Sequence, residues 1–301
     1  MTTTPFPIER ESSGQFGGIC TVRLEQPGRP VVVLDEPLIR RLDATLDALP
    51  AGCTGLVLAS ASKRVFVAGA DLKTIVELDD DALDRYLAYG QKVFGRLSQL
   101  PFPTAAAING AALGGGLEVA MHCDALIAAP SASGKPYPVG LPEAGLSICP
   151  GWGGTNLLAA RMDPAEAMRR TASGKPLTFD EARVAGLFDA VAASADELPG
   201  EAMRWISTQI SAGSTTRDGA PTRWIGRRNA AAKCMAAFDS VRDELPATEA
   251  AAAVADAIEA GLTRGWRAAL ECERAHLVRL RRTPEGAAAI QAFFERSAAK
   301  A

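Results

Sequence analysis

The chain has 301 residues, of which 48% are hydrophobic and 22% charged, and its formal net charge is −3. This length suits one large core, or one domain with an appended module. The near-neutral balance, without a basic run and interleaved aromatic residues, argues against nucleic acid as a partner. No window reaches the roughly 18 uninterrupted apolar residues that a membrane span needs.

The start of the chain, MTTTPFPIERESSG, is polar and has no apolar segment after a basic start, so we expect no secretory signal. Six cysteines are scattered without a CxxC pair: Cys20, Cys53, Cys123, Cys149, Cys234 and Cys272. This spacing favours reduced, mostly buried thiols over a zinc site or a disulfide framework. Together these features predict a soluble, cytoplasmic protein.

In chain order, the first two-thirds of the sequence alternate short apolar runs with helical periods. Strands are predicted at TVRLEQ (21–26), GLVLAS (55–60), TAAAIN (104–109) and DALIAA (124–129), with VVVLD (31–35) as an extended segment. We expect the strand at 104–109 to run straight into the glycines that follow it. Apolar residues at helical spacing predict helices over 38–49 and 83–100, and Pro101 and Pro103 end the second. This alternation predicts an α/β layer with short connections.

After about residue 160 the pattern changes. Thr178 and Glu181 form a predicted capping box, and Thr283 precedes a predicted helix start. From Glu201 onward the sequence is rich in alanine and arginine and predicts helices, with SAGSTTRDGAP (211–221) as a hinge or linker. We therefore expect an α/β catalytic core at 1–200. A helical region at 201–301 would pack on the core or on a sister subunit, or cover the active site.

The stretch NGAALGGGLEVAMHCD (109–124) places three consecutive glycines and Glu118 at the start of an apolar helix. A phosphate-binding loop does not fit, because both Gly-Lys pairs precede proline and GxGxxG from Gly114 would end on Val119. GxSxG is absent and the chain has only two histidines, so a serine or cysteine triad is unsupported. His122 is interpreted as a packing or capping residue.

A junction of strand, glycine and helix has another use, because it exposes backbone N–H groups and lets a ligand approach closely. For a thioester carbonyl, such a donor is half of an oxyanion hole. The helix dipole would favour the ionised form of Glu118, as a general base requires. A second glycine-bearing segment, FVAGADLKTI (66–75), could present another N–H from Ala70, and a third, GLPEAGLSICPGWGGT (140–155), carries Glu143.

The blocks FVAGADLK, AAINGAALGGGLEVAMHCD and LPEAGLSICPGWGGT resemble the signature blocks of the enoyl-CoA hydratase/isomerase (crotonase) superfamily. TFDEARVAGLFDAV and TPEGAAAIQAFFER are similar to later segments of that family, so the resemblance covers about 20–192 and 283–296. It implies an α/β fold, a crotonase-like spiral of ββα units with a helical C-terminal region. It also implies assembly into homotrimers or dimers of trimers.

The resemblance also implies site residues. Ala70 and Gly115 fall on the positions whose N–H groups polarise an acyl-CoA thioester carbonyl. Glu118 and Glu143 fall on the two carboxylates of the hydratases, with Glu118 as the base toward water and Glu143 as the acid that protonates the α-carbon. One carboxyl group must be charged and the other protonated, so their surroundings should push their pKa values apart. No metal or other cofactor is implied, because coenzyme A is part of the substrate.

Coenzyme A is expected to lie over residues 68–70, with contacts from Ala68, Gly69, Asp71, Leu72 and Gly114. For Asp71 a helix cap is favoured over a chemical role, and for Leu72 a place in the core fits at least as well as a place at the acyl site.

The expected adenine subsite departs from the family pattern, because GRPVVVLDEPL stands where members have a basic-asparagine run and Arg29 is the nearest cation. Phe293 and Arg296 resemble residues that a neighbouring subunit offers to the adenine and phosphate, although Arg296 also fits an exposed helix cation. The segment before Glu143, PSASGKPYPVG (130–140), is longer than usual. Glu143 itself also fits a first-turn acid of a helix.

The sequence therefore predicts an enoyl-CoA hydratase, a lyase that adds water syn across a 2-enoyl-CoA to give a 3-hydroxyacyl-CoA. It would act alone or as a stand-alone relative of the hydratase half of a β-oxidation enzyme in fatty acid metabolism. The alternatives are another crotonase reaction (double-bond isomerisation, dehydration or C–C cleavage) and a non-catalytic acyl-CoA-binding homologue.

Overall fold

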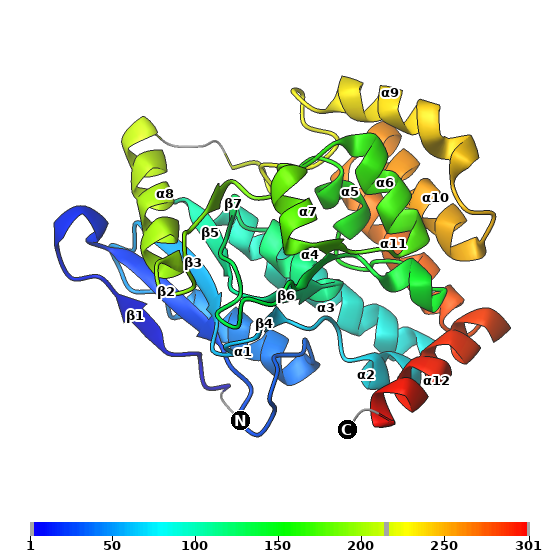
Figure 1. Ribbon diagram of the computed structural model, residues 1–301, viewed down its shortest axis with the longest axis horizontal. Coiled ribbons are helices and arrows are strands. Elements are labelled where there is room, and N and C mark those ends of the chain that lie inside the picture. The colour runs from blue at the N-terminus through cyan, green and yellow to red at the C-terminus, as the bar shows by residue number, and fades with distance from the viewer. Residues whose placement is uncertain (1–2, 214–216, 300–301) are drawn as a thin grey trace. The chain divides into compact units, whose positions relative to one another are not determined.

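The computed structural model describes residues 3–213 and 217–299 (Figure 1). These residues form two compact units. Unit 1 contains the residues up to 69 together with 92–139 and 177–222. Unit 2 contains 70–91, 140–176 and the residues from 223 onward. One division between the units falls inside helix α3 (Asp80–Gln99). The sequence-based boundary at residue 200 stays a prediction.

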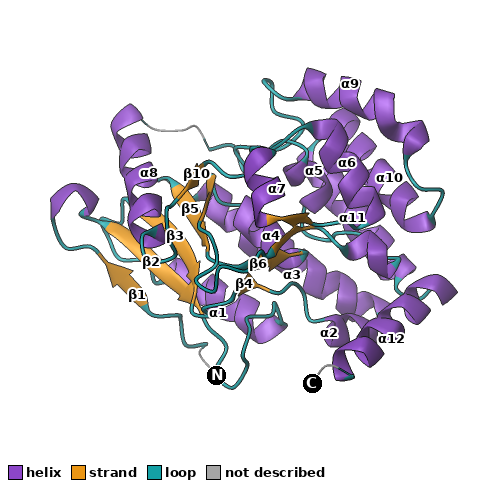
Figure 2. Ribbon diagram, in the orientation of Figure 1, coloured by secondary structure: helices purple, strands orange, loops and turns teal. Residues whose placement is uncertain are grey.

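Unit 1 is built on two β-sheets (Figure 2). The six-stranded sheet has the order β1-β2-β3-β5-β7-β10, formed by Ile8–Arg10, Ile19–Leu24, Gly55–Ser60, Thr104–Ile108, Ala125–Ala128 and Ala190–Val191. Its pairs are parallel except that β1 runs antiparallel to β2. The four-stranded sheet has the order β4-β6-β8-β9, formed by Val65–Val67, Ala111–Leu113, Pro138–Gly140 and Leu177–Thr178.

The strands repeat in pairs along the chain. β3, β5 and β7 lie in the large sheet, and each is followed by a strand of the small sheet, β4, β6 or β8, and then by helix. This repeat confirms the predicted α/β fold of ββα units. The expectation that the strand at 104–109 runs straight into the glycines is wrong, because the chain bends at Gly110 and β6 intervenes. At Gly110 an added Cβ would lie 2.2 Å from the Arg64 carbonyl oxygen, so this close approach requires glycine.

Helix α8 (Leu198–Ala212) covers one face of the large sheet. Every second residue of the central strands faces it, as a strand's alternation requires, and Val57, Ala59, Ala105, Ala107, Ala125 and Ile127 pack against Leu198, Ala202 and Ile206. The alanines leave room for the helix backbone to approach. Unit 1 is completed by helices α1, α4 and α7 and the 3-10 helix η1, which span Glu36–Asp47, Gly115–Met121, Phe179–Val184 and Gly14–Phe16.

The predicted capping box at the start of α7 is confirmed. The Thr178 N–H donates to Glu181 Oε2 at 2.7 Å, and the Glu181 N–H donates to Thr178 Oγ1 at 3.3 Å. The predicted strand at 21–26 is β2, which begins two residues earlier, at Ile19. All six cysteines are free thiols, four of them buried.

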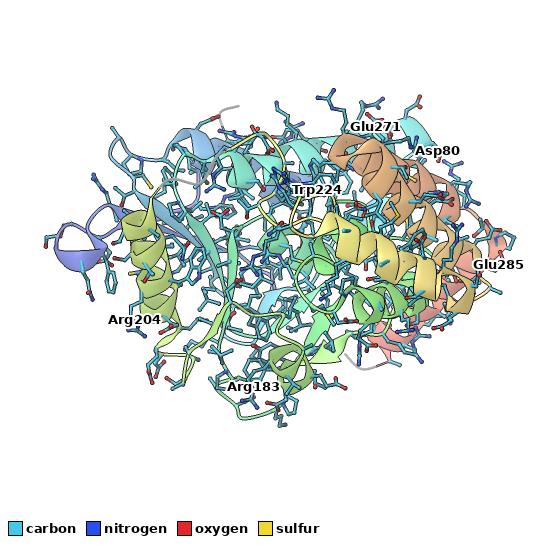
Figure 3. All side chains as sticks on the ribbon, turned by 90° about the horizontal axis from the view of Figure 1, so that it is seen from above. Asp80, Arg183, Arg204, Trp224, Glu271 and Glu285 are labelled. Atoms are coloured by element: carbon cyan, nitrogen blue, oxygen red, sulfur yellow. The ribbon has the colours of Figure 1, made fainter. Side chains whose placement is uncertain are left out.

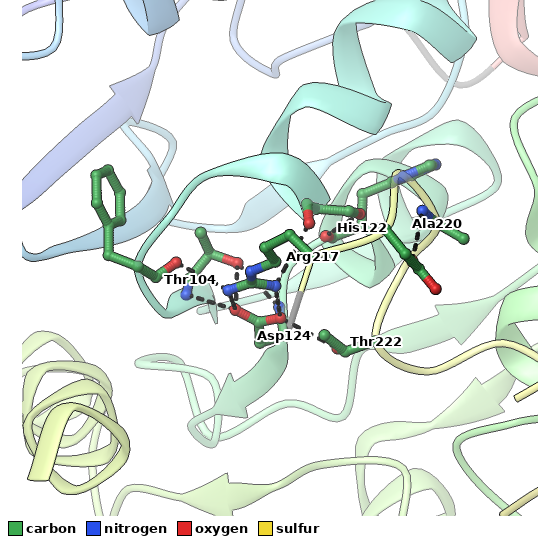
Figure 4. Close-up of polar contacts among 9 residues, drawn as sticks. Thr104, His122, Asp124, Arg217, Ala220 and Thr222 are labelled. Carbon is green, nitrogen blue, oxygen red and sulfur yellow. Dashed lines mark hydrogen bonds and ion pairs between the residues drawn. The ribbon is translucent and has the colours of Figure 1, made fainter. Parts of the chain in front are cut away.

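A buried ion pair attaches the segment after α8 to unit 1 (Figure 4). Asp124, directly before β7, accepts hydrogen bonds from both Arg217 Nη atoms, at 2.6 and 2.8 Å. The Thr104 N–H donates to the same carboxylate at 2.9 Å, and Thr222 Oγ1 donates at 3.1 Å. Of the predicted hinge at 211–221, residues 214–216 lie outside the described residues, while Arg217 is fixed in place.

The elements within unit 2 are helical. Besides the first part of α3 they are α2, η2, α5, α6, α9, η3, α10, α11 and α12, spanning Leu72–Glu77, Glu143–Leu146, Gly154–Leu158, Pro164–Ser173, Ala231–Val241, Arg242–Glu244, Glu249–Arg264, Trp266–Leu280 and Pro284–Ala298. The alanine-rich α10 contacts α5, α6, α9 and α11. The predicted helix start at Thr283 is confirmed, since its Oγ1 accepts from the Gly286 N–H at 3.1 Å. Across the described ranges, no helix combines the length and apolar character needed to cross a membrane.

Candidate active site

The three consecutive glycines form the entry to helix α4 in unit 1. Gly114 has φ 52° and ψ −129°, which a residue with a side chain rarely adopts. An added Cβ on Gly116 would lie 2.2 Å from the Val67 carbonyl oxygen, so this glycine lets α4 lie directly on β4. Gly115 is the first helical residue, where a backbone N–H has no acceptor within the helix. The sequence thus places this N–H between two glycines that the fold needs for other reasons.

Glu118 lies in the first turn of α4 and is buried, with 1% of its surface exposed. Its neighbours Leu117, Val119 and Ala120 are fully buried. Glu118 is therefore not a surface residue, and its carboxylate belongs to the interior of unit 1. His122 caps the same helix at its C-terminal end and packs beside Phe94, with ring centroids 6.1 Å apart, as the packing interpretation predicts.

The segment with Ala68 and Gly69 lies beside the glycine segment within unit 1. Strands β4 and β6 pair in parallel, and an added Cβ on Gly69 would lie 3.1 Å from the Leu113 carbonyl oxygen. Gly69 has φ 116°, and its carbonyl accepts from the Leu34 N–H at 2.8 Å. Ala68 is exposed. Two of the expected contact residues therefore lie next to the turn that carries Gly114.

Arg29 belongs to an open surface pocket of unit 1 formed by the β2–α1 connection together with Ala61 and Ser62. Its guanidinium lies 3.7 Å from Asp35, which caps α1 by accepting from the Leu38 N–H. The Arg29 side chain is 44% exposed. The expected adenine subsite thus contains a cation, and this cation forms an ion pair with Asp35.

In the longer segment before Glu143, residues near its two ends contact each other within unit 1. Tyr137 Oη donates to the Ala129 carbonyl at 2.7 Å, and its ring packs against Phe179 at 5.1 Å between centroids. The added residues form a turn between these two points, with Gly134 N–H donating to Ser131 O at 2.8 Å. The additional residues of segment 130–140 thus lie in a turn that ends before strand β8 begins.

In unit 2, Asp71 and Leu72 start helix α2. Asp71 caps it by accepting from the Lys73 N–H at 3.0 Å, so its structural role is confirmed, and Leu72 is half-buried. Ala70, directly before them, is also half-buried. At the other end of the chain, helix α12 packs against η2, the 3-10 helix that begins with Glu143. Phe293 and Arg296 are exposed on α12, as residues that serve a ligand or a sister subunit must be.

Glu143 has an unusual environment. The residue is half-buried, but its Oε2 atom is buried and has no hydrogen-bond partner among the described residues. Burial raises the pKa of this carboxyl group to about 8; the negative charge of Glu273 adds to the rise, and a hydrogen bond from its own backbone opposes it. This group carries a proton at neutral pH.

Glu273 is a site residue that sequence reasoning missed. It lies on α11, is fully buried, and accepts from the Gly153 N–H at 2.6 Å and the Thr155 N–H at 3.0 Å. Burial raises its pKa to about 7, and these bonds, with one from the Thr155 hydroxyl, oppose the rise. Its sequence signal was a glutamate on the apolar stripe of a helix, in line with Ala269 and Leu277.

Trp152 packs in the core of unit 2. Its Nε1 donates to the Leu87 carbonyl at 3.1 Å, and its ring meets Tyr86 edge-on at 5.7 Å. Gly90 has no room for a Cβ, which would lie 2.3 Å from the indole nitrogen. These contacts support a packing role for Trp152.

Comparison with known proteins fits this arrangement. Residues 14–218 match the family model for enoyl-CoA hydratase/isomerase. YngF of Bacillus subtilis (strain 168), provisionally named an enoyl-CoA hydratase/isomerase, is 40% identical over 144 residues, which are 48% of this chain. The matched stretch spans about half, 54%, of that relative.

Solved structures with the same fold cover nearly the whole chain. Human mitochondrial delta3-delta2-enoyl-CoA isomerase superposes with a TM-score of 0.69 at 21% identity, covering 98% of both chains. An enoyl-CoA hydratase from Bacillus anthracis has a TM-score of 0.59 at 25% identity and covers 96% of both. These likenesses confirm the predicted crotonase-like fold. This chain belongs to the enoyl-CoA hydratase/isomerase family.

Proposed function

We propose that this protein is an enoyl-CoA hydratase that adds water syn across the double bond of a 2-enoyl-CoA. Family membership supports an acyl-CoA thioester as the substrate class. The observation that carries the proposal is the state of Glu143: its Oε2 is buried without a partner, and its pKa is raised to about 8. A carboxylic acid that keeps its proton at neutral pH is what protonation of an α-carbon requires.

In the proposed reaction Glu118 is the base. It takes a proton from water as the water oxygen bonds to the β-carbon, and the π electrons move onto the thioester oxygen. The N–H groups of Ala70 and Gly115 stabilise this enolate oxygen. Glu143 then donates its proton to the α-carbon as the thioester carbonyl re-forms. One water is added, and proton exchange with solvent restores both carboxyl groups.

The coenzyme A portion is assigned to the remaining predicted residues. The exposed Ala68 suits the pantetheine, and Gly69, Asp71, Leu72 and Gly114 are assigned to the same subsite. The exposed Arg29, Phe293 and Arg296 suit the adenine and phosphates. We further propose a cytoplasmic homotrimer or dimer of trimers, in which α12 serves a neighbouring subunit, and no cofactor apart from the substrate's own coenzyme A.

The test is a hydration assay on the purified protein. Short- and medium-chain 2-enoyl-CoAs are supplied, and loss of the conjugated thioester absorbance is followed together with the mass of the product. Hydration predicts falling absorbance and a product heavier by one water. Conversion of a 3-enoyl-CoA into its conjugated isomer without hydration would instead assign an isomerase. Binding of acyl-CoA without turnover of any of these substrates would mark a non-catalytic homologue.

A further inference from the structure

Glu273 in unit 2 is a buried carboxyl group that the proposed reaction does not use. It occupies the apolar face of α11, between Ala269 and Leu277, and none of its surface is exposed. A glutamate is rarely fully buried unless its carboxylate is paired or hydrogen-bonded. Its donors therefore indicate what the residue is for.

Three donors to the Glu273 carboxylate lie in the turn that starts α5. They are the N–H of Gly153, the N–H of Thr155 and the hydroxyl of Thr155. In addition, the Cys149 thiol donates to the Glu273 backbone carbonyl at 3.5 Å. The segment 149–155, which follows Glu143 closely in the chain, is thus attached to α11 at both of its ends.

A second set of bonds holds the same segment. Gln91 Nε2 donates to the Gly151 carbonyl at 2.9 Å and to the Leu270 carbonyl at 2.8 Å. Arg274 Nη1 donates to Gln91 Oε1 at 2.9 Å, which fixes the orientation of the amide. Together with Glu273, these contacts leave the segment after Glu143 little freedom to shift.

Glu273 also acts on Glu143 through its charge. Each carboxyl group is in a low-dielectric environment, and the negative charge of Glu273 makes ionisation of Glu143 less favourable. Two carboxyl groups that interact in this way lose their protons in steps that belong to the pair. The pKa values of about 8 for Glu143 and about 7 for Glu273 both lie well above the ordinary 4.5 of a glutamate, with that of Glu143 the higher.

Several charged groups on α11, or directly after it, pair with residues other than Glu273. Arg274 pairs with Asp84, Arg279 with Glu249, and Arg281 with Asp80. His276 pairs with Asp256 of α10 at 3.0 Å. Near Glu273 the thiol of Cys272 has a pKa raised by burial, by Asp256 and by Glu273 itself, so it is neutral at physiological pH. α5 carries no titratable side chain.

We propose that Glu273 is a positioning residue for Glu143: it fixes the segment after Glu143 and provides a second carboxyl group whose titration is linked to that of Glu143. The inference rests on the proposed role of Glu143 as the proton donor. Its consequence is that a helix about 130 residues further along the chain than Glu143 sets the protonation of the candidate active site.

The test is a titration of the full-length protein labelled with [δ-13C]glutamate, followed by NMR. Glu143→Gln and Glu273→Gln assign the two carboxyl signals. In the wild type we expect both signals to move in two linked steps. In Glu273→Gln the Glu143 signal should titrate in one step, with its midpoint lower by about one pH unit or more, the size at which two groups behave as a pair.

Two further variants sharpen the result. Thr155→Val removes one donor to the charged form of Glu273, so Glu273 holds its proton more tightly and Glu143 should ionise at lower pH, by less than in Glu273→Gln. Glu271→Gln is the matched control, because Glu271 is an exposed glutamate on the same helix (Figure 3). It should leave the Glu143 titration unchanged. In turnover, Glu273→Gln should lower kcat about 10- to 100-fold with a smaller change in KM. Glu271→Gln should leave both kcat and KM unchanged.

The proposal is overturned if Glu143 titrates as an independent group in the wild type. It is also overturned if Glu273→Gln and Thr155→Val lower only the melting temperature and leave the Glu143 midpoint unmoved, since Glu273 would then merely support the fold. If Glu273→Gln fails to fold, the Glu143 titrations of the wild type and of Thr155→Val still test the proposal. The titration requires no turnover, so its outcome is separate from that of the hydration assay.

Discussion

Two carboxyl groups, one in each unit, are held in opposite ways. Asp124 in unit 1 accepts from a backbone N–H, from threonine hydroxyls and from both Nη atoms of Arg217 (Figure 4). Glu143 in unit 2 has a buried oxygen without a partner and a second carboxyl group as its electrostatic neighbour. The first arrangement fastens chain segments together, and the second keeps a proton available. What separates a structural carboxylate from a reactive one here is the set of donors around it, more than burial itself.

The largest expected effect is on turnover. Glu118→Gln and Glu143→Gln should each lower kcat by about 10²- to 10⁴-fold, the usual contribution of a general acid or base, with modest change in KM. Glu143→Gln should fold normally, because the native carboxyl group is already neutral at pH 7. Steady-state kinetics with a 2-enoyl-CoA measure the first claim and circular dichroism the second. Full activity in either variant would remove that residue from the mechanism.

For Asp124 the comparison predicts a large loss of stability and little change in turnover. Asp124→Asn leaves the buried Arg217 cation without its counter-charge, so the free energy of unfolding should fall by about 3–5 kcal/mol. Turnover per folded molecule should stay near that of the wild type. Urea unfolding measures the loss, with Glu201→Gln as a control because its pair with the exposed Arg204 is worth about 0–1 kcal/mol (Figure 3). Equal losses in the two variants would contradict the account.

The pH dependence of stability should reveal the Glu143–Glu273 pair. Both pKa values are raised on folding, from 4.5 to about 8 and about 7, so the folded state binds more protons than the unfolded state between these values. The stability that these two groups contribute is fully present below the unfolded pKa of 4.5 and falls progressively as the pH rises from there to about 8. Chemical unfolding at a series of pH values should show this decline, flattened in Glu143→Gln. An identical profile in the variant would argue against the raised pKa.

The smallest effect is expected at the edge of the Asp124 cluster. Thr222→Val removes one of several donors to this carboxylate, while Arg217 and Thr104 remain. The free energy of unfolding should fall by about 0.5–1.5 kcal/mol, as for a single hydrogen bond. Thermal unfolding resolves a change of this size. A loss as large as that of Asp124→Asn would mean that the hydroxyl, and not the ion pair, holds the segment.

Local patterns predicted much of the fold. The buried strand at 55–60, the helix ended by Pro101 and the caps at Thr178 and Thr283 depend on neighbouring residues, so the sequence displays them directly. Strand β6 was missed because three residues carry little periodicity.

The site was predictable only in part, for a related reason. Glu118 and Glu143 stand in recognisable blocks, whereas Glu273 meets Gly153 from 120 residues away and Arg217 meets Asp124 from 93. Such pairings are decided by tertiary packing. A glutamate on an apolar stripe was the one local hint of the first, and Arg217 lies in a segment whose composition indicates only a linker.

The central claim is that Glu143 delivers a proton to the α-carbon of a 2-enoyl-CoA. Its most direct test is turnover in deuterium oxide, with mass spectrometry and NMR of the product. The account predicts a 3-hydroxyacyl-CoA with one deuterium at the α-carbon, formed by the wild type and by Glu271→Gln but not at a comparable rate by Glu143→Gln. A product with a shifted double bond and no added water, or deuterated 3-hydroxyacyl-CoA formed equally fast by Glu143→Gln, would contradict it.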